Sequence, residues 1–319
     1  MRPAPARSPA PITWPLAPLL VAVLLLETGP AAAKGSPPSP PSQPDPAGST
    51  AATELALKVR EVQQTARSLR GRFAVLAEPP FVVAGDSGAA DVRRFATGLI
   101  RWSVTELKKH YFARDPQKPI AIWLFKDRTS YEVNAARLTG EAPDTPIGFY
   151  SSTLRALIMN IRTGGGTLVH EIVHPFMEAN VPNCPPWLNE GMGSLYEGVG
   201  RRNHEIWGYL NWRLPGLQRV VRARKLPPSS LADLLALDER GFYLKQPGLH
   251  YAEARYLLYY LQDKGLLRTF FSRYLERGRR DRTGASTLKQ VLGITDLNAF
   301  QRRWERYLLT LEYRNPPVR

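Results

Sequence analysis

Residues 164–180 read GGGTLVHEIVHPFMEAN, and this stretch restricts the fold more than any other part of the chain. Residues four apart on an α-helix lie about 40° apart around its axis, so His170 and His174 can direct their imidazoles to one point. Two neutral imidazoles on a rigid helix suit Zn²⁺. Glu171 projects from the adjacent face, where its carboxylate can reach a water held by the metal. The stretch therefore predicts a helix with two metal ligands and a general base.

A catalytic zinc needs a third protein ligand besides the two histidines. One large class of HExxH enzymes places a third histidine six residues after the second, but this chain has Asn180 there. His204 and His250 are more remote candidates. Glu190 is the best candidate, because a proline-rich loop turns the chain before it and can direct the first turn of a second helix back towards the histidines. The sequence thus favours a His, His, Glu ligand set.

The motif HExxH followed by the segment WLNEG resembles the gluzincin metallopeptidases, particularly the peptidase MA-like domains and the aminopeptidase branch. The likeness covers roughly residues 118–319. It implies a zincin-like fold in which one Zn²⁺ ion is held by His170, His174 and Glu190. It also implies that Glu171 is the general base that activates a zinc-bound water.

Other residues are candidates for supporting roles. The segment HYAEARYLLYYL is similar to the family segment in which a tyrosine precedes an apolar helix, which implies that Tyr251 donates a proton to the oxyanion. His250 is the alternative donor. Ser194 and Glu197 lie on the same helix face as the third ligand, where either could form a hydrogen bond that orients a ligand. We interpret Asn189 as a helix-start residue only.

Glycine and proline residues flank the histidines. Gly164–Gly166 is no phosphate-binding loop, because no Lys-Ser/Thr pair follows it. These glycines allow either flexibility before the helix or close approach of a substrate backbone. Pro175 removes an amide donor and crowds the preceding turn, so we expect the helix to kink or to end early there.

The substrate is expected to be a peptide or protein cut at an internal bond. The strand LRALIMNI lacks the glutamate with which related aminopeptidases hold a free amine. An edge strand at residues 155–161 could pair with an extended peptide, which favours an endopeptidase. Two alternatives stay open. One is a cell-envelope binding module with a metal site that does not hydrolyse bonds, and the other is a zinc amidase acting on envelope material.

Hydrophobic spacing predicts an α+β fold with two lobes in residues 53–319. Residues 53–180 form a lobe with a mixed β-sheet and the HExxH helix, and residues 181–319 form a helical lobe without strands. Helical spacing marks residues 53–73, 88–112 and 128–138, strand patterns mark residues 81–85 and 118–127, and a hairpin is expected within residues 147–161.

The N-terminal 52 residues are expected to lie outside this domain. Residues 1–33 combine two arginines, an apolar run and Ala31–Ala33, the pattern of a cleaved export signal. The protein is therefore expected to be periplasmic or secreted, or membrane-anchored if the signal is not cleaved. Residues 34–52 are rich in proline and serine and are predicted to form a disordered tether.

The net charge indicates which partners the protein could bind, and the cysteine content shows whether disulfides can stabilise it. The formal net charge is +15, which could attract an anionic envelope polymer or a membrane surface, or could be spread over solvated helix faces. No recognisable nucleic-acid motif accompanies the basic residues. Cys184 is the only cysteine, so the chain forms no internal disulfide and its thiol is expected to be inert.

Overall fold

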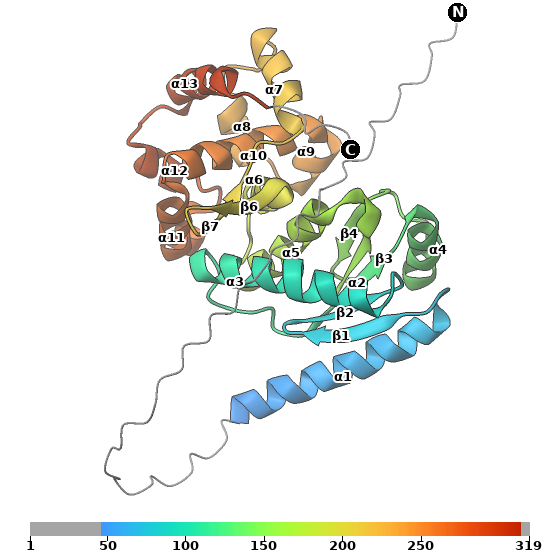
Figure 1. Cartoon of the computed structure of the whole chain (residues 1–319). Helices are drawn as coiled ribbons and strands as arrows, with labels where there is room; N and C mark the ends of the chain where they lie inside the picture. The colour runs from blue at the N-terminus through green and yellow to red at the C-terminus, as the bar shows by residue number, and fades with distance from the viewer. Residues whose placement is uncertain (1–45, 314–319) are drawn as a thin grey trace, which may run out of the picture.

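The computed structural model describes residues 46–313 (Figure 1). The expected signal at residues 1–33 and most of the expected tether lie outside the described residues. The predicted end of the tether at residue 52 is wrong, because helix α1 runs from Pro46 to Ser68. Proline fits the first turn of a helix and alanine is the strongest helix former, so the Ala-rich residues before Thr53 extend the predicted helix.

A five-stranded sheet organises the N-terminal half. Its strands are β1 (Ala74–Glu78), β2 (Phe81–Gly85), β3 (Ile120–Phe125), β4 (Gly148–Ser151) and β5 (Ala156–Asn160). Their spatial order is β1-β2-β3-β5-β4. The three inner strands are parallel, while β1 and β4 pair antiparallel at the two edges. This arrangement confirms the predicted mixed sheet, although β1 was not expected from the sequence.

The strand predicted to form an edge is an inner strand. β5 pairs with β3 on one side and with β4 on the other, so the expectation of an edge at residues 155–161 is wrong. A hairpin pattern does not reveal which of its two strands joins the rest of the sheet. β5 is buried along its whole length, whereas β4 is mostly half-buried. The continuous apolar run of β5 suits an inner position, and β4 takes the edge.

Helices cover both faces of this sheet (Figure 1). On one face lie α1 and α4 (Arg128–Thr139), and on the other lie α2 (Ala89–Arg94), the π-helical segment η1 (Phe95–Ile100), α3 (Arg101–His110) and α5 (Gly165–Asn180). Trp123 and Ile158 belong to the core on the α1 side, whereas Ile122 and Leu157 belong to the core on the α5 side. Adjacent strand residues thus point into two separate apolar layers.

The C-terminal half is mainly helical. Its helices are α6 (Pro186–Leu195), α7 (Arg213–Arg222), α8 (Ser230–Ala236), α9 (Glu239–Leu244), α10 (Pro247–Asp263), α11 (Leu267–Arg277), α12 (Ala285–Leu292) and α13 (Leu297–Thr310). Short 3₁₀ segments are η2 (Ile161–Thr163), η3 (Tyr196–Gly198) and η4 (Gly278–Asp281). Within residues 46–313, no helix is long and apolar enough to cross a membrane.

A β-hairpin interrupts this half, so the expectation that strands stop at Val181 is wrong. Strands β6 (Val199–Arg202) and β7 (Glu205–Gly208) pair antiparallel around Asn203 and His204, whose φ angles are 52° and 63°. Two consecutive positive φ angles fit a tight hairpin turn. Four-residue strands are too short to produce a clear alternating pattern, which explains why the sequence did not reveal them.

One apolar core joins the two halves. Buried side chains continue from the sheet through α5 and α6 to α10. Trp187 of α6 is fully buried, and its indole nitrogen donates a hydrogen bond to the carbonyl of Thr283 at 2.8 Å. Because α6 packs against both α5 and α10, the shared core fixes the relative positions of the helices that carry the candidate ligands.

Candidate metal centre and cleft

Helix α5 brings the histidine pair together in the protein interior. The ring centroids of His170 and His174 lie 4.9 Å apart, and His170 is buried. The helix continues through Pro175 to Asn180, so the expectation of an early end is wrong. Phe176 and Met177 beyond the proline are buried in the main core. Their burial offsets the hydrogen bond that proline removes.

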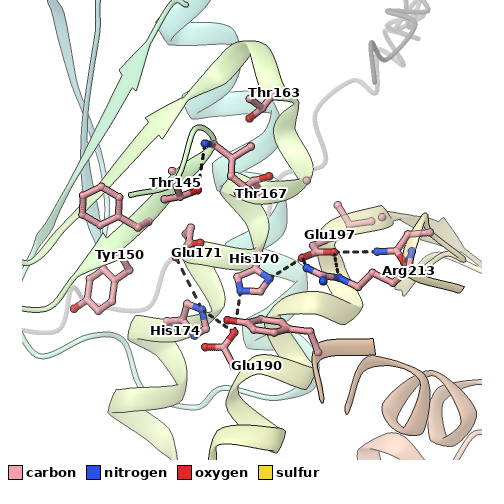
Figure 2. A pocket seen from close by; sticks show the side chains of 18 of the residues that line it. Thr145, Tyr150, Thr163, Thr167, His170, Glu171, His174, Glu190, Glu197 and Arg213 are labelled. Atoms are coloured by element: carbon pink, nitrogen blue, oxygen red, sulfur yellow. Dashed lines mark hydrogen bonds and ion pairs between the residues drawn. The ribbon is translucent and has the colours of Figure 1, made fainter. Parts of the chain in front are cut away.

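Helix α6 supplies the third member of the group. Its first residue is Pro186, and its first turns return Glu190 to the histidines. Glu190 Oε2 lies 3.2 Å from His170 Nε2 and 3.9 Å from His174 Nε2 (Figure 2). One ligand atom from each of the three residues lies within 4.8 Å of the others. Two imidazole nitrogens and one carboxylate oxygen at this spacing could hold a metal ion.

Both histidines also have partners on their outer nitrogens. His170 Nδ1 lies 3.3 Å from Glu197 Oε1, and His174 Nδ1 lies 3.1 Å from Asn189 Oδ1. A partner at Nδ1 favours the tautomer in which Nε2 carries the lone pair that a metal requires. The interpretation of Asn189 as a helix-start residue only was therefore incomplete. Its side chain contacts the second histidine.

Glu197 is itself clamped by two polar side chains. Arg213 donates to both carboxylate oxygens, with Nη2–Oε1 and Nε–Oε2 distances of 2.7 and 3.0 Å (Figure 2). Asn211 Nδ2 donates to Oε2 at 2.9 Å. Burial opposes ionisation of Glu197, but His170 and Arg213 hold its pKa well below the usual range. The group that faces His170 is therefore an anion in a fixed orientation.

The protonation states of the group reflect close charge pairing. Burial lowers the pKa of His170, but the nearby carboxylates of Glu190 and Glu197 outweigh it and raise the pKa to about 10. Burial raises the pKa of Glu190, but His170 and His174 outweigh it and lower the pKa to about 2. His170 and Glu190 thus stabilise each other's charged forms. A metal cation would replace the proton on His170.

Glu171 lies beside this group with different surroundings. It is buried, and burial raises its pKa, although His170 and His174 oppose the shift. Its Oε2 lies 4.0 Å from His174 Nε2, and it lines the same cleft as the three candidate ligands. A raised pKa makes this carboxylate a stronger base than an ordinary glutamate.

Two tyrosines lie close to the candidate ligands. Tyr243 of α9 donates its hydroxyl proton to Glu190 Oε1 at 2.6 Å, which leaves Oε2 for the histidines. Tyr251 of α10 lies with its ring centroid 6.3 Å from that of His170, and the Arg213 guanidinium lies 5.0 Å from the Tyr251 ring centroid. Burial, and then Glu190, raises the pKa of Tyr251. Both phenols stay protonated and can donate.

Three other predicted candidates lie elsewhere. His250 Nδ1 contacts the carbonyl of Phe242 at 2.9 Å, and His250 does not line the cleft. Ser194 is fully buried, and its Oγ has no hydrogen-bond partner in residues 46–313, so the expected bond from Ser194 to a ligand is absent there. His204 is exposed in the β6–β7 turn. Only Glu197 of the two expected supporting residues contacts a candidate ligand.

The glycines before the histidines serve packing. A Cβ atom on Gly166 would lie 1.9 Å from the carbonyl oxygen of Glu197. Helix α5 can therefore approach η3 closely only because this position has no side chain. Gly164, at φ 107°, adopts a backbone angle that L side chains rarely adopt. The expected role in admitting a substrate backbone is not needed to explain Gly166.

The candidate ligands open into a cleft of about 2590 Å³. Gly148, Phe149 and Tyr150 of edge strand β4 line it, and so does the β6–β7 hairpin. Cys184 also lines this cleft, and burial raises the pKa of its thiol. The volume exceeds the roughly 300–1,000 Å³ of small-molecule sites. The cleft can therefore accommodate a segment of polymer.

Comparison of the sequence with known protein-family models and with curated proteins gives no match.

Proposed function

We propose that the protein is a zinc-dependent metallopeptidase of the gluzincin type that hydrolyses internal peptide bonds. The observation that carries the proposal is the buried group of His170, His174 and Glu190, with Glu171 beside it, at a large cleft. The His, His, carboxylate donor set suits zinc and leaves a position for water or substrate. The partners on the outer nitrogens of both histidines support a metal-binding role.

The chain's own residues would divide the chemistry between them. Zinc, when bound, supplies a Lewis acid that lowers the pKa of water and polarises a carbonyl. Glu171 accepts the proton of the attacking water and returns it to the leaving amine, for which its raised pKa is suited. The Tyr251 phenol donates a hydrogen bond to the carbonyl oxygen as negative charge develops there.

Edge strand β4 is the element we propose for substrate alignment. It pairs with β5 on one side only, and it borders the cleft. An extended peptide can add to such an edge through main-chain hydrogen bonds, independently of its side chains. The neighbouring strand β5, within the segment LRALIMNI, lacks a glutamate that could hold a free amine. These features favour cleavage within a chain over removal of single terminal residues.

The test compares acetylated and free-amine versions of one peptide. We expect cleavage at the same internal bond with kcat/KM values within about an order of magnitude, a difference of ~1.4 kcal/mol in transition-state binding. The matched control is Glu171→Gln, which should cut neither peptide. Stepwise loss of single residues from the free-amine peptide, with the acetylated peptide intact, would show that the protein is an aminopeptidase instead.

A further inference from the structure

The β6–β7 hairpin forms one wall of the cleft along its whole first strand. Residues 197–202 all line the cleft, from the Glu197 carboxylate beside His170 to the end of β6. The Tyr209 hydroxyl donates to the carbonyl of Arg201 at 2.7 Å. A Cβ on Gly200 would lie 2.8 Å from the Tyr209 ring, so this ring lies close against the strand. The wall is thus a braced surface that starts at the candidate metal centre.

Exposed aromatic side chains gather at this cleft. Tyr209, Trp212 and Tyr243 are 43, 55 and 39% exposed, and all three line the cleft. No other aromatic side chain in the described part of the chain stands out as an exposed large hydrophobic group. Exposed aromatic groups concentrated in one place indicate a binding surface.

The arginines of this wall differ in whether they have an acidic partner. Arg213 is committed to Glu197, and Arg201 lies 3.3 Å from Glu106. The Arg202 guanidinium lies 4.5 Å from the Trp207 ring centroid, and within residues 46–313 no carboxylate lies within ion-pair distance of it. Its cross-strand neighbour Glu205 is paired with Arg268 instead. Arg202 is therefore an exposed cation that is held by an aromatic ring.

We propose that Arg202 and Trp207 form a substrate subsite for an acidic side chain, an inference that rests on the proposed peptidase function. A guanidinium stacked on indole keeps its edge N–H groups free for a carboxylate. Residues Val199–Arg202 cover roughly 10 Å at ~3.3 Å per residue, the same rise as an extended peptide. The acidic residue therefore lies about three to five residues from the bond that is cut. Aromatic rings alone would suit a sugar equally well, but the unpaired cation favours an anion.

Binding to the Glu171→Gln protein loaded with zinc tests the subsite without hydrolysis. The probes are two fluorescent peptides that differ by one Glu-to-Gln exchange. We expect the Glu peptide to bind about three- to fivefold more tightly, the scale of one exposed ion pair. Adding Arg202→Gln should abolish this difference. Adding Arg128→Gln should keep it, because Arg128 also lines the cleft but is already paired with Glu132 at 2.7 Å.

Two outcomes separate this inference from the proposed function. If the Glu peptide keeps its advantage in the Arg202→Gln protein, attraction is due to net charge and the subsite is wrong. If the advantage depends on Arg202 but the wild-type protein cuts neither peptide, the subsite holds and the peptidase proposal fails. In a cleaving enzyme, the bond that is cut should lie about three to five residues from the Glu.

Discussion

At the scale of single residues, the site contains two phenols with different contacts. Tyr243 is hydrogen-bonded to Glu190 Oε1, so its proton is already used to orient a candidate ligand. Tyr251 lies over the His170 ring and under the Arg213 guanidinium, and lines the cleft. Under the proposed function, Tyr243 would hold the candidate ligand Glu190, and Tyr251 would act in the reaction.

Substituting each tyrosine by phenylalanine separates these roles. Tyr251→Phe should lower kcat by about 10- to 10³-fold with little change in KM, because we propose that its hydroxyl acts mainly in the transition state. Tyr243→Phe should weaken zinc binding by about tenfold, because Glu190 loses the hydrogen bond that orients it. Steady-state kinetics and chelator competition measure the two effects.

The same two variants can also contradict the assignment of Tyr251 as the proton donor. Full activity in Tyr251→Phe, together with loss of kcat in zinc-saturated Tyr243→Phe, would transfer the role of proton donor to Tyr243. His250 is a poor substitute donor, because it contacts the carbonyl of Phe242 and does not line the cleft.

At the scale of elements, the close approach of α5 and η3 brings the Glu197 carboxylate to His170 Nδ1. Gly166 occupies the second position of α5, directly against the carbonyl of Glu197. Any side chain there must push apart the two elements that bring Glu197 to His170 Nδ1. The orientation of the candidate ligand His170 therefore depends on the absence of a side chain one turn earlier in the same helix.

Gly166→Ala should destabilise the protein by about 1–3 kcal/mol, because its methyl group overlaps the backbone of η3. The matched control is Gly248→Ala, at the second position of α10, where a Cβ meets no atom within 4 Å. That change should be neutral or slightly stabilising, since alanine favours the helix. Urea unfolding followed by circular dichroism compares them. Equal stability of the two variants would contradict the packing role of Gly166.

At the scale of the whole molecule, much of the architecture follows from hydrophobic patterns. The order of the predicted elements, with helices between the strands and a hairpin before the histidine helix, predicts a mixed sheet with helices packed against it, and the structure has this arrangement. The order of strands in the sheet cannot be predicted from these patterns, because a hairpin pattern does not show which of its two strands lies at the edge. The β6–β7 hairpin could not be predicted from the hydrophobic pattern either, because each of its strands has only four residues.

In the candidate site too, some residues could be predicted from the sequence and others could not. His170, His174 and Glu190 could be predicted, because they lie close in sequence within two helices that a tight loop connects. Tyr243 and Arg213 could not, because they reach the site from α9 and α7. Only the packing of the helical half on the shared core brings these helices to the ligands. No local pattern in the sequence encodes that long-range contact.

The most direct test of the central claim is the zinc content of purified variants, measured by mass spectrometry alongside peptide cleavage. Wild-type protein and Glu171→Gln should each hold one zinc ion per chain, and only the wild type should cleave. His170→Ala, His174→Ala and Glu190→Ala should each lower zinc affinity by more than about a hundredfold, because each removes a donor of the same group. Equal zinc content in all four variants would contradict the assignment of the metal centre.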